Sequence, residues 1–196
     1  MKKIVSILFI LIIGFNAKLF ADDNQSIKRI FEGEENTNIT IIAYESLTCG
    51  HCADFHKNVY PKLKKDFIDT GLVKIEFRHF PLDISAFNAS KIGQCNNDGN
   101  PDVLNILFLG QKKWAKGQTP EETKKYLKKF LDDEGIKVDF EKCLNNKAIE
   151  DFVLNDRIEG VKEFKVNATP TIIINDKKFD KVLNYKNLKK YLEKLI

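Results

Sequence analysis

The feature that most constrains the fold is a pair of cysteines, Cys49 and Cys52, at the junction between two hydrophobic patterns. Residues 39–44 form a short apolar run rich in β-branched side chains, which is typical of a buried strand. Beyond it, apolar side chains recur at helical spacing, at Cys52, Phe55, Val59, Leu63 and Phe67. The chain is therefore expected to pass from strand to helix at Cys49, and Pro61 should kink that helix.

The four residues Cys49-Gly50-His51-Cys52 have the spacing of a redox-active pair. The thiolate is the reactive form of cysteine, and a helix start favours it because unpaired N–H groups and the positive end of the helix dipole face the sulfur. We expect His51 to add a positive or hydrogen-bonding group. One helical turn lets Cys52 reach Cys49 and close a disulfide. Because Cys52 falls on the apolar face, it is the predicted buried, resolving cysteine.

Other uses of two closely spaced cysteines fit this chain less well. A structural zinc site takes four ligands, and His56 is the spare candidate near the pair. A c-type haem needs a histidine directly after the second cysteine, where this chain has Ala53. A purely structural disulfide would not explain the position at a helix start. We therefore predict neither a metal ion nor a cofactor, and we expect His56 and His79 to be structural or surface histidines.

The rest of the chain continues the strand–helix–strand order. Residues 72–78 alternate between apolar and polar side chains, which predicts a second strand parallel to the first. Residues 84–164 read as mostly helical. The remaining patterns predict a strand at residues 171–174, a tight turn at Asn175-Asp176, a hairpin partner at Phe179–Leu183 and a closing helix at Tyr185–Ile196. This order predicts an α/β fold in which a helical insertion of about residues 84–164 separates the two halves of a sheet.

The N-terminus predicts export. Lys2 and Lys3 precede an apolar run that ends at Phe15, and Ala21 is followed by two acidic residues. This is the layout of a cleavable signal peptide, residues 1–21. The run is short for a membrane span of about 20 residues, although an uncleaved anchor is the alternative. Removing residues 1–21 lowers the formal charge from +4 to +1, because they carry three lysines and no acid. That balance gives no reason to expect a nucleic-acid partner.

Four features together resemble the DsbA family of bacterial disulfide oxidoreductases, within the thioredoxin-like superfamily. They are the strand leading into residues 46–52, the segment Phe77–Leu82, the helical insertion, and Val166-Asn167-Ala168-Thr169-Pro170-Thr171. The resemblance covers roughly residues 36–196. It implies a thioredoxin-like fold for residues 22–196 and catalytic roles for Thr169 and Pro170. Their peptide bond is expected to be cis and packed against the active-site disulfide, and the Thr169 backbone is expected to pair with the substrate chain.

The resemblance also bears on the other two cysteines. Four cysteines can pair in three ways, and an exported chain meets an oxidising compartment in which disulfides persist. Some family members carry a second, non-catalytic disulfide in the helical insertion, where Cys95 and Cys143 stand. We therefore predict a structural Cys95–Cys143 disulfide, with two free thiols as the alternative.

The chain departs from the family pattern at three positions. Gly50 stands where proline is common. Gly-His is the dipeptide of protein disulfide isomerases, which are less oxidising than DsbA, at about −180 against about −120 mV. Asn167 stands where glycine is often found, and Glu45 lies nearer the motif than the buried glutamate of many members.

These observations predict an exported, periplasmic thiol–disulfide oxidoreductase that works as a monomer. It would oxidise reduced secreted or periplasmic proteins through a Cys49–Cys52 disulfide and be reoxidised by a membrane quinone reductase of the DsbB type. A disulfide isomerase or reductase is the first alternative, favoured by Gly50 and by the threonine before Pro170. Residues 22–38 are short, however, for the dimerisation domain that such isomerases usually carry. A non-catalytic binding module of the same fold is the alternative from another class, which the intact motif disfavours.

Overall fold

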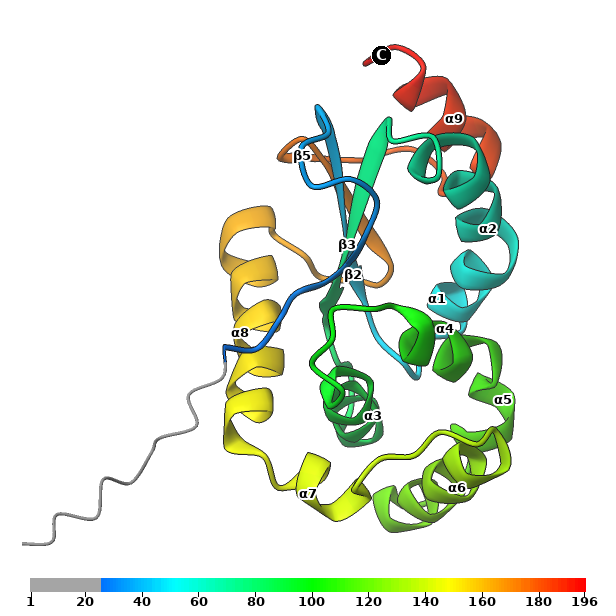
Figure 1. Ribbon diagram of the computed structural model, residues 1–196, viewed down its shortest axis with the longest axis vertical. Coiled ribbons are helices and arrows are strands. Elements are labelled where there is room, and N and C mark those ends of the chain that lie inside the picture. The colour runs from blue at the N-terminus through cyan, green and yellow to red at the C-terminus, as the bar shows by residue number, and fades with distance from the viewer. Residues whose placement is uncertain (1–25) are drawn as a thin grey trace, which may run out of the picture.

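A five-stranded sheet lies at the centre of the molecule (Figure 1). The computed structural model describes residues 26–196, so the predicted signal peptide and its cleavage after Ala21 lie outside the described residues and stay predictions. Strands follow the spatial order β1-β3-β2-β4-β5, and only β2 and β3 run parallel among neighbours. Their bounds are β1 Ile30–Glu32, β2 Ile39–Glu45, β3 Val73–His79, β4 Thr171–Ile174 and β5 Lys177–Lys178. This sheet confirms the predicted α/β, thioredoxin-like fold.

Helices cover both faces of the sheet, with α8 on one side and α1, α2 and α9 on the other (Figure 1). One helical segment follows β2, made of α1 Gly50–Asp54, η1 Phe55–Val59, α2 Tyr60–Leu63 and η2 Lys64–Ile68. Between β3 and β4 the chain forms α3 Ile84–Gln94, α4 Asp102–Leu109, α5 Gln111–Trp114, α6 Pro120–Asp133, α7 Phe140–Leu144 and α8 Lys147–Phe164. The last helix is α9 Tyr185–Leu192. The helical insertion therefore separates the two halves of the sheet, as predicted.

Strand β2 is buried on both faces, which explains its unbroken apolar sequence. Ile41 and Ala43 pack into the larger core shared with the helical segment after β2. Ile42 and Tyr44 point to the opposite face, where they pack with Phe80, Val166 and Ile173. This alternation follows from the two-residue period of a strand, and it fixes the point at which the chain leaves the sheet toward Cys49.

Two π-helical turns interrupt the helix that follows β2. The backbone N–H of Tyr60 bonds to the carbonyl of Phe55, five residues earlier, and Asp69 bonds to Lys64 in the same way at 2.8 Å. The first π turn ends at Val59, two residues before Pro61, which has no N–H to continue an α-helical ladder. The predicted irregularity at Pro61 thus takes the form of a widened turn.

The last hairpin begins earlier than the sequence analysis predicted. Asn175 and Asp176 have φ of 45° and 63°, the left-handed conformation of a two-residue turn. A two-residue turn joins its two strands directly, so β5 starts at Lys177 rather than at Phe179. The predicted strand at Phe179–Leu183 is therefore wrong. Phe179 still donates its N–H to the Ile172 carbonyl at 2.8 Å.

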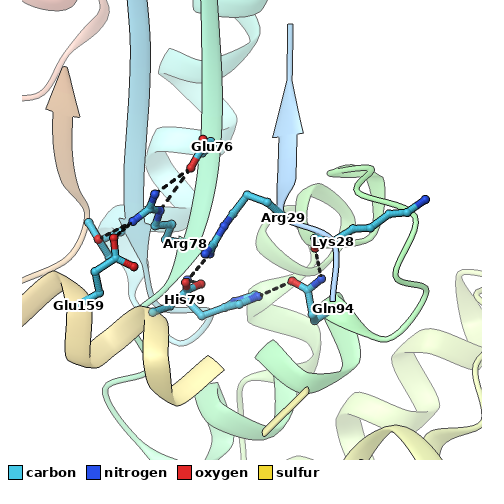
Figure 2. A network of polar contacts seen from close by, with 9 residues as sticks. Lys28, Arg29, Glu76, Arg78, His79, Gln94 and Glu159 are labelled. Carbon is cyan, nitrogen blue, oxygen red and sulfur yellow. Dashed lines mark hydrogen bonds and ion pairs between the residues drawn. The ribbon is translucent and has the colours of Figure 1, made fainter. Parts of the chain in front are cut away.

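A polar network ties helix α8 to the carboxyl end of β3 (Figure 2). Asp156 of α8 is 1% exposed; it pairs with Arg29 and accepts the backbone N–H of His79 at 3.0 Å. Arg78 pairs with Glu159 of α8 and with Glu76 at 3.0 Å. The carboxylates of α8 thereby fix the helical insertion against the strand that lies beside β2.

The helical insertion packs into the same large core as the sheet and the helix after β2, and a disulfide crosslinks it. Trp114 is fully buried and donates its ring N–H to the Leu107 carbonyl at 2.8 Å. A disulfide joins Cys95, at the end of α3, to Cys143 of α7. Within residues 26–196, no helix has the length and apolar character needed to cross a bilayer.

We predict that this disulfide stabilises the fold without taking part in catalysis. Its loop spans 48 residues, for which loss of the cross-link costs about 3–4 kcal/mol in the chain-entropy model. The double variant Cys95→Ala/Cys143→Ala should therefore melt about 6–16 °C lower. Calorimetry in a Cys49→Ser/Cys52→Ser background leaves only this disulfide to differ. An unchanged melting temperature, or free thiols at both positions in protein isolated from cells, would refute the prediction.

Candidate active site

Cys49 occupies the N-cap of helix α1, directly after the loop that leaves β2. Its backbone is extended, with φ −78° and ψ 119°, and its carbonyl accepts the N–H groups of Cys52 and Ala53 at 3.1 and 3.2 Å. The Cys49 side chain is partly exposed, whereas Cys52 is fully buried. Both are thiols in this structure. Only Cys49 can therefore be reached by another molecule.

The pKa values of the two cysteines are shifted in opposite directions. A hydrogen bond from the Cys52 thiol, then Thr169 and the backbone N–H groups of Cys52 and His51, lower the pKa of Cys49 to about 5. Burial, which works against this, is the second-largest influence. The pKa of Cys52 is raised, first by burial, then by its hydrogen bond to Cys49 and by the nearby Glu45. Cys49 is thus the thiolate and Cys52 the protonated partner.

The Thr169–Pro170 loop lies against Cys49. The peptide bond between Thr169 and Pro170 is cis, and the Cys49 sulfur lies 3.3 Å from the Thr169 carbonyl oxygen. A cleft of about 280 Å³ beside the motif is bordered by His51, Thr169 and Pro170. The structure therefore brings together all five candidate residues, although 120 positions separate Cys49 from Thr169.

His51 contributes to the site differently from the expectation. Its side chain is exposed, and in the described part of the chain no hydrogen bond joins its ring to Cys49. What acts on the Cys49 sulfur is the backbone N–H of His51. The expected polar influence therefore comes from the helix start, while the ring faces the cleft next to Thr169.

Glu45 and His56 form a buried pair behind Cys52. His56 Nε2 lies 2.9 Å from Glu45 Oε2, and His56 Nδ1 lies 2.7 Å from Asn105 Oδ1. The His56 ring stacks on Phe108 with centroids 4.1 Å apart. The other carboxylate oxygen of Glu45 is buried and has no hydrogen-bond partner among the described residues. His56 is therefore structural rather than a surface residue, and its spacing of four from Cys52 was the signal that both share one helix face.

Gln111 of α5 is a site residue that the sequence analysis missed. It is 8% exposed, and its amide donates to the carbonyls of Leu47 and Cys49 at 2.8 and 2.9 Å. One side chain of the helical insertion thus braces both ends of the loop that presents Cys49. Its sequence signal was weak, since a lone glutamine in a helical stretch rarely indicates a brace.

The arrangement is suited to exchange between a thiol and a disulfide. It combines a partly exposed nucleophilic sulfur, a buried partner sulfur and an adjacent backbone carbonyl that could bind another chain. Within residues 26–196, no group of three or more histidine, cysteine, aspartate or glutamate side chains is placed to hold a metal ion.

Comparisons with known proteins agree with this geometry. A family model described as Thioredoxin matches residues 25–194. A Rickettsia conorii protein, whose name places it among the protein-disulfide oxidoreductases, is 29% identical over 161 residues, 79% of this chain and 54% of that protein. This chain therefore spans about half the length of such relatives. Disulfide bond formation protein D of Bacillus subtilis is 27% identical over 179 residues, covering 83% of this chain and 74% of that protein.

Among solved structures, the crystal structure of Wolbachia pipientis alpha-DsbA1 is similar in both fold and sequence. It superposes with a TM-score of 0.76 at 29% identity, covering 85% of this chain and 90% of that chain.

We predict that Cys49 titrates far below an ordinary thiol. Its alkylation rate in the reduced protein should rise through a midpoint near pH 5 and stay flat above it, because the thiolate is then fully formed. Cys52 should stay unreactive throughout, because it is buried and protonated. Stopped-flow alkylation with mass mapping measures both, and a Cys52→Ala variant tests the contribution of the Cys52 thiol by shifting the midpoint upward. A midpoint near the free-thiol value of about 8.5 would contradict the proposed stabilisation.

We also predict that the hydrogen bond between His56 and Glu45 stabilises the fold. His56→Phe keeps a ring against Phe108 but leaves the buried Glu45 side chain without its partner, which should cost at least about 1–3 kcal/mol. Denaturant unfolding measures the loss in the free energy of unfolding. The double variant Glu45→Leu/His56→Phe is the control, and it should recover much of the loss because both partners are then apolar; an equal loss in both variants would refute the pairing.

Proposed function

Because this chain belongs to the thioredoxin family, among its DsbA-like thiol–disulfide oxidoreductases, we propose that it introduces disulfide bonds into exported proteins. The observation that carries the proposal is the asymmetry of the two cysteines. A partly exposed Cys49 with a pKa of about 5 is a stable thiolate when reduced, so the Cys49–Cys52 disulfide readily accepts electrons.

The proposed reaction runs through two exchanges. A client thiolate attacks the Cys49 sulfur of the Cys49–Cys52 disulfide; the new bond forms as the old one breaks. Cys52 leaves with the electron pair and takes up a proton, as its raised pKa favours. A second client thiolate then attacks the client sulfur of the mixed disulfide, and Cys49 leaves as a thiolate. The client loses two electrons to the cysteine pair, one client proton ends on Cys52 and the other passes to solvent.

The surrounding residues have defined parts in this scheme. The Thr169 carbonyl, 3.3 Å from the Cys49 sulfur, is positioned to accept a client backbone N–H once the disulfide has formed. Glu45, which His56 holds by a hydrogen bond, helps to raise the pKa of Cys52 and so favours its protonation when it leaves. Gln111 holds the backbone of the loop that presents Cys49 through its bonds to the Leu47 and Cys49 carbonyls.

Export and reoxidation complete the proposal. Clients would meet the protein in the periplasm after removal of residues 1–21. A membrane quinone reductase of the DsbB type would return the cysteine pair to the disulfide, accepting the two electrons. Both points rest on the sequence pattern and on the family, and the protein would act as a monomer.

An isomerase is the second candidate, since the Gly50-His51 dipeptide favours it. The two activities are separated by comparing oxidation of a reduced two-cysteine peptide with repair of a protein whose disulfides are scrambled. We expect stoichiometric peptide oxidation within seconds, little repair, and no activity in Cys49→Ser. Vigorous repair with negligible peptide oxidation, or a stable dimer in solution, would assign the isomerase instead.

A further inference from the structure

A second cleft opens on the other side of helix α1, between it and the turn from α4 to α5. Figure 1 shows these three helices side by side. The cleft measures about 420 Å³, and its apolar lining is Ala53, Phe108 and Leu109, the last 62% exposed. Gly50 lies at its mouth, where a side chain would meet no atom within 4 Å. Through Gly50, the cleft reaches the residue that directly follows the reactive Cys49.

Three lysines border this cleft: Lys57, Lys112 and Lys113. Lys113 is neutralised by Glu134, 3.0 Å away. In the described residues, the ammonium groups of Lys57 and Lys112 have neither an ion pair nor a hydrogen bond, and both side chains are exposed. Asp54 is the single acid on the lining, and Asn58 already donates to it at 2.5 Å. The cleft thus combines an apolar floor with two unpaired positive charges.

The cleft on the opposite side of α1 has a different chemistry. It shares Asp54 with the lysine-bordered cleft and has no lysine on its lining; its other lining residues are His51, Phe55, Val59, Thr169, Pro170, Val182 and Leu183. The two clefts reach the motif at neighbouring residues, the lysine-bordered cleft at Gly50 and the other at His51. The clefts on the two sides of the motif therefore differ in charge. Lysine side chains, which can attract a negatively charged client residue, border only one of them.

We propose that this lysine-bordered cleft receives the client segment that flanks the reacting cysteine, and that it favours segments combining a large apolar side chain with a carboxylate. The inference rests on the proposed function, since it presupposes that Cys49 exchanges with protein thiols. Apolar contact with Phe108 and Leu109 anchors the segment, and Lys57 and Lys112 attract its carboxylate. Client choice is then set beside the motif, by side chains of α4, α5 and η1 rather than by the redox pair itself.

The size of the effect follows from ordinary surface electrostatics. The client carboxylate can form exposed ion pairs with Lys57 and Lys112. Together these should raise the oxidation rate of an acidic client by about threefold to tenfold at low salt. The preference should fall toward unity by about 0.5 M salt, because exposed charges are then screened within a few ångströms.

The test uses reduced peptides that are identical except for one residue near their cysteine pair. Each carries leucine and, beside it, glutamate, glutamine or lysine, placed before the first cysteine in one series and after it in another. The second-order rate of oxidation by the full protein is measured by stopped flow, and the readout is the ratio of rates for the glutamate and lysine peptides. A ratio cancels any change in the intrinsic reactivity of Cys49.

We expect a ratio of about three to ten for the natural protein in one of the two series, and a ratio below one for Lys57→Glu/Lys112→Glu. The matched control is Lys65→Glu/Lys186→Glu, which changes the net charge equally on exposed lysines away from the cleft and should keep the original ratio. Equal rates for all peptides, or the same change in both double variants, would overturn the inference while leaving the oxidase proposal standing. If no peptide is oxidised, the oxidase proposal itself fails. If Lys57→Glu/Lys112→Glu folds poorly, the natural protein still tests the inference, because its ratio should fall toward one as the salt concentration rises.

Discussion

The unequal solvation of two neighbouring sulfurs is the constraint on which the rest of this structure depends. Cys49 sits where backbone N–H groups converge at a helix start, and Cys52, one turn later, is sealed in the core. Each sulfur fixes the state of the other, because the protonated Cys52 donates to the Cys49 thiolate and lowers its pKa. A disulfide between them would lose that stabilisation, and the pair is therefore biased toward the dithiol.

Keeping this asymmetry requires the two halves of the molecule to hold one loop from several sides. Strand β2 delivers the loop, the Thr169–Pro170 turn covers Cys49, and Gln111 reaches across from the helical insertion to both of its ends. The network around Asp156 and the Cys95–Cys143 disulfide fixes that insertion in turn. Residues far from the sulfurs thereby act on their geometry, and the helical insertion also supplies the lysine-bordered cleft beside them.

Much of this architecture could be read from local patterns in the sequence. Three patterns each lie within one short stretch of sequence and predict one element each. They are the β-branched run at residues 39–44, the helical spacing from Cys52 onward and the alternation at residues 72–78. Two features needed three-dimensional information. The brace from Gln111 spans 62 residues and leaves no periodic signal. The tight turn at Asn175-Asp176 was predicted correctly, but β5 starts directly after it, at two exposed lysines that carry no strand pattern. For His56, the sequence predicted the helix face that it shares with Cys52. It could not predict the hydrogen bond to Asn105, which lies 49 residues away.

The reduction potential of the Cys49–Cys52 pair tests the central claim most directly. It is obtained by equilibrating the protein with glutathione buffers at pH 7 and following the fraction of disulfide. A thiolate as stable as the one at Cys49 should place the potential above about −200 mV, toward the oxidising end of the thioredoxin-like enzymes. A value near thioredoxin's, about −270 mV, would contradict the account, because the reduced pair would then gain little from its position at the helix start.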